Sequence, residues 1–209
     1  LHVCYCHTPP RYLYGYATAR EWKKNLIFRV IGEIANHFLR LVDFKSAQNV
    51  DYFIANSKNV SERITKFYRR DSTVIYPPVD VDSIMYHVSS SKYKKDTKYM
   101  LHNTSYYLAG GRLARPKHID VIVEACHKLK VPLKVFGRVF GDALNISGSK
   151  YPNIQFLGEV TDEEKLELMR NAKAYIFAAE DEDFGITPVE AMSVGTPVIA
   201  YRSGGVVES

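Results

Sequence analysis

The chain has 209 residues, of which 46% are hydrophobic and 24% are charged, with 28 Lys and Arg against 23 Asp and Glu. This composition excludes a disordered chain, a collagen-like chain and a small disulfide scaffold. The length allows one large domain or two small ones, with enough chain to bury a core. The net charge of +5 favours an anionic ligand such as a nucleotide, a nucleic acid or an acidic membrane surface, but scattered basic residues are also typical of a solvated surface.

Short apolar runs alternate with helical patterns along the chain. In the first part, the patterns predict strands at 1–6, 51–55 and 72–76, and helices at about 21–44 and 58–68. Residues 80–98 contain few apolar side chains, which indicates a linker or a domain edge. In the last part, the patterns predict strands at 106–110, 133–136, 154–157, 174–178 and 197–201, and helices at about 116–129, 161–171 and 188–194.

This alternation predicts an α/β fold with mostly parallel sheets that are covered on both faces. Ligands of such folds bind beyond the carboxyl ends of the strands. The candidates for chemistry are therefore the residues that directly follow the expected strands, namely His7, Asn56, Arg112, Gly137, Gly158 and 180–186.

The cysteines Cys4, Cys6 and Cys126 are odd in number and lack metal-binding or C-x-x-C spacing. They predict neither a structural metal nor a disulfide framework. Positions 4 and 6 share one face of a strand, so two small buried side chains are expected there. Reduced cysteines indicate a cytoplasmic location, and no apolar run approaches the ~20 residues of a membrane span.

The segment 180–192 follows an expected strand and opens the next helix. Its sequence predicts Thr187 as the N-cap, Pro188 in the first helical turn and Gly195 at the C-terminal end. The free backbone N–H groups at the start of this helix suit a phosphate. Gly185 has no side chain and lets a ligand approach the backbone closely.

Two carboxylates, Glu182 and Glu190, frame this turn and are expected to face one cleft. For Glu190, an alternative role of equal weight is a capping box, in which its side chain bonds to the backbone N–H of Thr187. Glu182 is one of four consecutive acidic residues, so the alternative for this side chain is a solvated acidic loop.

A second candidate segment, residues 110–117, joins a glycine pair to Arg112 and Lys117. Arginine offers a forked contact and lysine a point charge, a combination that suits a diphosphate. The alternative is a pair of ordinary surface cations. The segment does not match the Walker pattern of phosphate-binding loops.

A third candidate is His7, which follows the first expected strand within Cys6-His7-Thr8-Pro9-Pro10. A histidine at a strand end can act as a general acid or base, or it can bind a sugar. A lone histidine is more often a satisfied polar group, so both interpretations stay open for His7.

Taken together, these motifs resemble the retaining glycosyltransferases of family 4, in particular their mannosyltransferase-like members. Glu182 and Glu190, within Glu-Asp-Phe-Gly-Ile-Thr-Pro-Val-Glu-Ala-Met, are similar to the E-x7-E signature of that family. The other similar segments are Gly111-Arg112-Leu113 with Lys117, Tyr5-Cys6-His7-Thr8-Pro9-Pro10-Arg11-Tyr12, Ile54-Ala55-Asn56-Ser57 and Val74-Ile75-Tyr76-Pro77-Pro78-Val79-Asp80. These segments run in order over nearly the whole chain.

The resemblance implies the GT-B architecture, in which two Rossmann-like domains with parallel sheets face each other across a cleft. Residues 1–77 would be an incomplete amino-terminal, acceptor-side domain. Residues 78–209 would be the donor-nucleotide-binding domain without its end. Both ends of the chain look like cuts through secondary structure, so we expect a fragment with weak donor binding and little or no transfer activity of its own.

The resemblance also implies roles for individual residues. Glu190 would hold the ribose of the donor, and Arg112 and Lys117 would neutralise its diphosphate. Glu182 and His7 would contact the transferred sugar as the catalytic residues. The remaining donor contacts would come from Gly137, Val160, Phe184, Gly185, Ile186 and Thr187.

The implied donor is a GDP- or UDP-linked hexose, with mannose favoured, and the implied acceptor is a polysaccharide or a glycolipid. No cofactor or metal is expected, because Arg112, Lys117 and a helix N-terminus already face the charge that builds on the leaving diphosphate. The expected setting is the cytoplasm, with peripheral contact to the inner face of a membrane.

Two other functions fit parts of the sequence. One is a catalytically silent nucleotide-sugar-binding module on the same fold, against which the intact Arg112, Lys117, Glu182 and Glu190 argue. The other is a nucleic-acid-binding protein, which the lack of a basic stripe or a binding motif disfavours. We therefore expect no nucleic-acid partner.

Overall fold

The computed structural model describes residues 1–19, 25–81, 84, 105–140 and 150–209. Most of the linker expected at residues 80–98 lies outside these residues. The chain divides into two compact units. Unit 1 contains Leu1–Pro77 together with Glu180–Phe184 and Arg202–Ser209, and unit 2 contains Pro78–Ala179 and Gly185–Tyr201.

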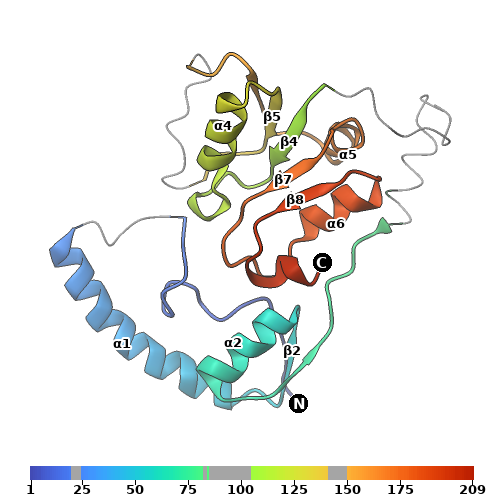
Figure 1. Ribbon diagram of the computed structural model, residues 1–209. Helices are drawn as coiled ribbons and strands as arrows, with labels where there is room; N and C mark the ends of the chain where they lie inside the picture. The colour runs from blue at the N-terminus through green and yellow to red at the C-terminus, as the bar shows by residue number, and fades with distance from the viewer. Residues whose placement is uncertain (20–24, 82–83, 85–104, 141–149) are drawn as a thin grey trace. The chain divides into compact units, whose positions relative to one another are not determined.

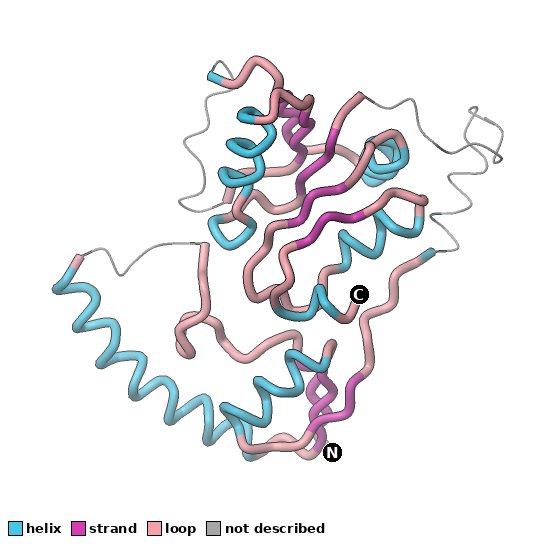
Figure 2. The backbone as a smooth tube through the Cα atoms, viewed as in Figure 1, coloured by secondary structure: helices cyan, strands magenta, loops and turns pink. Residues whose placement is uncertain are grey.

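The described part of unit 1 contains a parallel sheet, whose strands are β1 (Val3–Cys6), β2 (Tyr52–Ala55) and β3 (Ser72–Val74), in that order. The helix α2 (Lys58–Tyr68) follows β2 and packs against it (Figures 1 and 2). Its N-cap is Ser57, whose Oγ accepts a hydrogen bond from the N–H of Val60 at 3.0 Å. The core of the unit consists of Cys6, Ala47, Val50, Phe53, Ala55, Val60, Ile64 and Tyr68.

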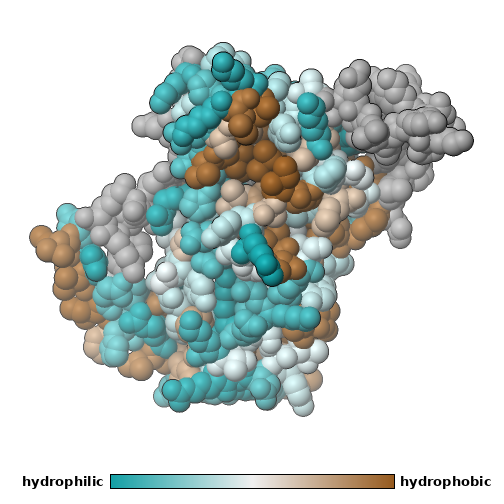
Figure 3. Space-filling view, viewed as in Figure 1, coloured by the Kyte–Doolittle hydropathy of each residue, from teal (hydrophilic) through white to brown (hydrophobic). Residues whose placement is uncertain are grey.

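The long helix α1 (Leu26–Gln48) turns its polar side toward the rest of unit 1. The amide Nδ2 of Asn36 donates to the carbonyl oxygen of Tyr12 at 3.4 Å, and Nη1 of Arg40 donates to that of Leu13 at 2.9 Å. The exposed apolar side chains of α1, some of which are visible in Figure 3, are Leu26, Ile27, Phe28, Val30, Ile31, Ile34, Phe38, Leu39, Leu41 and Val42. The helical periodicity of the sequence therefore predicts the position of α1 correctly. The exposed apolar side chains that produce this periodicity do not pack into the core of unit 1.

The described part of unit 2 contains a second parallel sheet, in the order β6-β5-β4-β7-β8. Its strands are β4 (Tyr107–Gly110), β5 (Leu133–Phe136), β6 (Ile154–Gly158), β7 (Tyr175–Phe177) and β8 (Val198–Ala200). Figure 1 shows α4 (Ile119–Lys128) on one side of this sheet, and α5 (Asp162–Arg170) and α6 (Ile186–Ser193) on the other. Along the chain, β5 and β6 are added on one side of β4, and β7 and β8 on the other side. Because the crossover connections are right-handed, the two directions of growth place helices on opposite faces of the sheet. The predicted α/β class with parallel sheets is confirmed.

One core cluster of unit 2 lies between α4 and the sheet, and its buried residues are Ala109, Leu113, Ile119, Ile122, Val123, Cys126, Leu133, Val135 and Ile154. Leu166 and Met169 of α5 and Ala191 of α6 are buried as well. The helix predicted at 116–129 is divided in two. A short 3-10 turn, η2 (Arg115–Lys117), ends at His118, whose φ of 47° interrupts the helix before α4 begins. Lys117 consequently lies on a short turn and not on α4.

Candidate functional site

The ends of β4, β5 and β6 meet at a surface formed largely by glycine backbone. Gly111, Gly137 and Gly158 lie at these ends and have φ angles of 108°, 115° and 74°, a region that favours glycine. The N–H of Gly137 donates to the carbonyl oxygen of Gly158 at 2.6 Å. A Cβ atom on Gly137 would overlap the backbone of Gly111. The backbones of Gly137 and Gly111 are thus packed against each other, whereas the space at the Cβ positions of Gly111 and Gly158 is open, so that a ligand can approach the backbone there.

Two cations, Arg112 and Lys117, lie on the loop that follows β4. Arg112 is exposed, and its guanidinium carbon lies 5.6 Å from the centre of the Phe140 ring. The Nζ atom of Lys117 lies 4.8 Å from the centre of the ring of Phe177, the last residue of β7. Both cations therefore belong to the edge of the unit 2 sheet at which the strands end.

The helix α6 begins earlier than the sequence pattern predicts. Its N-cap is Gly185, with a left-handed φ of 95°, and no side chain caps this end in the described structure. Thr187 is therefore the second helical residue, and the prediction of Thr187 as the N-cap is wrong, because a left-handed glycine ends the preceding loop two residues before Thr187. The alternative of a capping box between Thr187 and Glu190 is wrong for the same reason. At the other end, Gly195 follows the helix with a φ of 84°, as expected.

Glu190 is held instead by a lysine of the neighbouring helix. The Nζ atom of Lys165 lies 3.1 Å from Oε1 of Glu190 and 2.9 Å from Oδ1 of Asp162. The side chains of Lys165 and Glu190 are 19% and 18% exposed, whereas that of Asp162 is 88% exposed. Burial opposes the charge of Lys165, but the hydrogen bonds to Asp162 and Glu190 outweigh it, and the pKa of Lys165 is raised above its ordinary 10.5. Sequence reasoning missed Lys165, because 25 positions separate it from Glu190.

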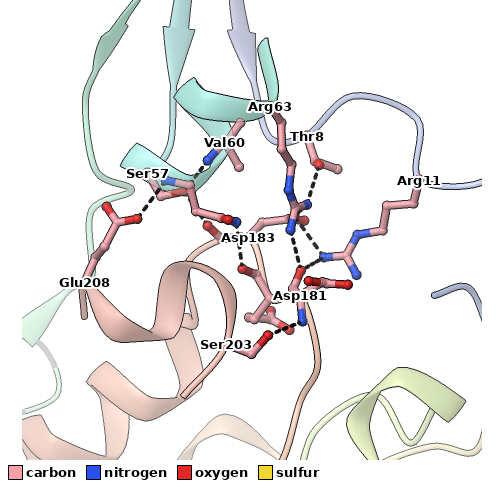
Figure 4. A network of polar contacts seen from close by, with 11 residues as sticks. Thr8, Arg11, Ser57, Val60, Arg63, Asp181, Asp183, Ser203 and Glu208 are labelled. Atoms are coloured by element: carbon pink, nitrogen blue, oxygen red, sulfur yellow. Dashed lines mark hydrogen bonds and ion pairs between the residues drawn. The ribbon is translucent and has the colours of Figure 1, made fainter. Parts of the chain in front are cut away.

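The loop that carries Glu182 belongs to unit 1, where hydrogen bonds hold its backbone (Figure 4). The N–H of Gly205 donates to the carbonyl oxygen of Glu182 at 2.6 Å, and Oγ of Ser57 donates to that of Asp183 at 2.5 Å. The carboxylate of Asp183 is 22% exposed and forms ion pairs with two arginines. Of the four consecutive acidic residues, Asp183 is therefore paired and not simply solvated.

His7 lies exposed just beyond β1, with its ring centre 5.2 Å from that of Tyr5 in an edge-to-face arrangement. Because Cys6 of β1 is in register with Ala55 of β2, His7 and Asn56 occupy neighbouring positions at the end of the unit 1 sheet. Asn56 is 4% exposed, and its Oδ1 has no hydrogen-bond partner in the part of the chain that the structure describes.

The structure distributes the candidate residues between the two units. The candidates in unit 2 are Arg112, Lys117, Gly137 and Val160 on the loops that follow the strands, and Gly185, Ile186, Thr187 and Glu190 at the start of and on α6. The candidates in unit 1 are His7, Glu182 and Phe184. Within the described ranges, no three His, Cys, Asp or Glu side chains gather to hold a metal ion, and no helix is long and apolar enough to cross a membrane.

Residues 94–209 match the protein family described as Glycosyl transferases group 1. The chain belongs to this family. The resemblance to family 4 that the sequence motifs carry is therefore confirmed.

Curated relatives extend the match to the rest of the chain. The chain is 23% identical to the alpha-1,3/1,6-mannosyltransferase ALG2 of Candida glabrata, over 98% of this chain and 51% of that protein. It is 28% identical to ALG2 of Homo sapiens, over 66% of this chain and 38% of that protein. The chain thus spans about half the length, or less, of these relatives.

Solved structures show the same fold. The sucrose-phosphate synthase of Thermosynechococcus elongatus superimposes with a TM-score of 0.64 at 19% identity, over 98% of this chain and 51% of that one. Anabaena Alr3699/HepE, solved with UDP and glucose, superimposes with a TM-score of 0.60 at 21% identity, over 83% and 50%. The chain therefore has the fold of GT-B glycosyltransferases, of which it spans about half.

Proposed function

We propose that the complete gene product is a retaining glycosyltransferase that moves a hexose from a nucleotide sugar to a glycan or a lipid-linked acceptor. Mannose is the proposed sugar, because distant relatives of the chain are named mannosyltransferases. The nucleotide is UDP or GDP, and solved structures of similar fold contain UDP. Three free cysteines favour a reducing, cytoplasmic setting.

The observation that carries this proposal is that Arg112 and Lys117 lie on the loop after β4, at the same edge of the sheet as the glycines that end β4, β5 and β6. When a sugar–phosphate bond breaks, negative charge builds on the leaving diphosphate. Cations and backbone N–H groups that face this charge stabilise it more in the transition state than in the ground state. This arrangement can therefore support sugar transfer from a nucleotide diphosphate.

We assign the other candidate residues to the ribose, the base and the sugar of the donor. In this proposal Glu190 holds the ribose, Gly137 and Val160 contact the phosphate and the base, and the backbone N–H groups of residues 184–187 contact the phosphate and the sugar. Glu182 and His7 contact the transferred sugar. Residues 78–209 form the donor-binding domain, and Leu1–Pro77 belongs to the acceptor-side domain.

The test is transfer of labelled sugar by the complete gene product, with a panel of UDP- and GDP-linked hexoses as donors. We expect transfer by the natural protein and a loss of about 100-fold or more in kcat/KM for Lys117→Ala, the range found when one charge-stabilising donor is removed. The matched control is Lys128→Ala, whose side chain is 74% exposed on α4 and pairs only with Glu124 in the described structure. Equal loss in both variants, or no loss in Lys117→Ala, would contradict the assignment.

A further inference from the structure

A cluster of polar contacts in unit 1 lies around the carboxylate of Asp183, directly after Glu182 (Figure 4). Its Oδ1 lies 2.8 Å from Nη2 of Arg11 and 2.8 Å from Nη1 of Arg63. The side chain of Arg63 is 3% exposed, and its Nη1 also donates to Oγ1 of Thr8 at 3.0 Å. A buried arginine needs such a partner, because an unpaired charge in the interior is strongly destabilising. We call Asp183, Arg11 and Arg63 the Asp183 clasp.

The clasp acts on the backbone of the loop as well as on one side chain. Nη2 of Arg63 and Nη2 of Arg11 both donate to the carbonyl oxygen of Asp181, at 3.0 and 2.8 Å. Together with the bonds from Gly205 to Glu182 and from Ser57 to Asp183, they give three consecutive carbonyl groups partners in unit 1. The backbone on both sides of Glu182 is therefore fixed.

The frame that carries the clasp is itself well anchored. Arg63 lies on α2, and the first turn of α2 is closed by a carboxylate from the far end of the chain. The N–H groups of Lys58 and Asn59 donate to Glu208 at 2.7 and 2.8 Å. A carboxylate at a helix N-terminus satisfies free N–H groups and complements the helix dipole. The clasp thus connects the Glu182 loop to α2, a helix whose first turn is capped.

We propose that Asp183 is a positioning residue, which through Arg11 and Arg63 holds the carboxylate of Glu182 at the transferred sugar. This inference rests on the proposed function, in which Glu182 contacts that sugar. Asp183 does not touch the substrate in this account. A displacement of about 1 Å at a reacting centre can lower a rate by about 100-fold, so fixing this loop has a direct kinetic consequence.

The test uses the complete gene product with Asp183→Asn, which keeps the shape of the side chain and removes the charge that both arginines bind. We expect faster amide hydrogen exchange in peptides covering 181–184, and a kcat that is about 10- to 100-fold lower with a KM for the donor within about threefold of normal. The control is Glu124→Gln, which makes the same carboxylate-to-amide change in an exposed pair on α4. It should alter neither measurement.

A second variant, Arg11→Gln, removes the more exposed arm of the clasp and keeps the claim testable if Asp183→Asn folds poorly. Unchanged exchange at 181–184, unchanged kcat, or an increase confined to KM would each overturn the positioning role. If the natural protein transfers no sugar from any donor, the proposed function and the positioning of Glu182 for catalysis both fall. The exchange measurement then still decides whether the clasp fixes the loop.

Discussion

Replacing Lys165 by methionine should weaken nucleotide binding, although Lys165 is not one of the residues that we propose to contact the nucleotide. Methionine keeps much of the length and the apolar stem of the side chain but removes the charge that faces Glu190. In the natural protein the Nζ–Oε1 distance is 3.1 Å, and both side chains are less than one-fifth exposed. Glu190 would then stand half-buried beside an apolar group and would turn toward water.

The size of the effect follows from these contacts. A hydrogen bond between charged groups contributes about 1.5–3 kcal/mol to stability, so the variant should lose about 2 kcal/mol of unfolding free energy. If Glu190 leaves the ribose, the lost hydrogen bond corresponds to about 1.5–2 kcal/mol of binding, or roughly 10- to 30-fold in Kd. The raised pKa of Lys165 means that its proton is retained through neutral pH, and that the stabilisation disappears only as pH rises beyond 10.5.

The assay is calorimetric titration of the complete gene product with UDP and GDP, followed by the 2′-deoxy form of the tighter ligand. The natural protein should prefer the ribonucleotide, and Lys165→Met should lose much of that preference. The control is Asp162→Asn, which removes the other, 88% exposed partner of Lys165 and should cost less than about 1 kcal/mol. An unchanged ribose preference in Lys165→Met would refute the idea that Lys165 holds Glu190 at the ribose.

Two further predictions concern the fold. Gly137→Ala should lower the unfolding free energy by about 3 kcal/mol, because its φ of 115° is strained for alanine and its Cβ would overlap the adjacent loop. Gly15→Ala, with a φ of 80° but open space, should cost only about 1 kcal/mol, and equal costs in urea denaturation would contradict this account. Burial raises the pKa of Cys6 from 9.0 to about 12, so the unfolded thiol ionises first, and stability should fall as pH rises above 9. Maleimide should accordingly modify the half-buried Cys4 well before Cys6, and the reverse order would contradict the assigned burial.

The parts of the structure that the sequence predicted well depend on local signals. Ser57 is followed by an amphipathic helix, so its capping role can be read from neighbouring residues. The strands of both sheets are short apolar runs between turn residues. Local signals fail where the backbone conformation is unusual. His118 and Gly185 adopt positive φ angles, and these move the starts of α4 and α6 away from the positions that Pro116 and Thr187 suggest.

The parts that the sequence missed are contacts between distant residues. Asp183 and Arg63 are 120 positions apart, and Lys165 and Glu190 are 25 positions apart. No periodicity or capping pattern joins such pairs, because each side chain alone resembles an ordinary surface charge. Their partners follow only from the packing of α2 with the Glu182 loop and of α5 with α6.

The proposed activity of the complete gene product is transfer of a hexose from a nucleotide sugar with retention of configuration. NMR of the purified product formed from an α-linked UDP- or GDP-hexose measures both the transfer and the configuration. The proposal predicts a new glycosidic bond whose anomeric proton has the same α configuration as the donor. A β-linked product would contradict the retaining mechanism, and the absence of any glycosidic product with every donor would contradict the proposed activity itself.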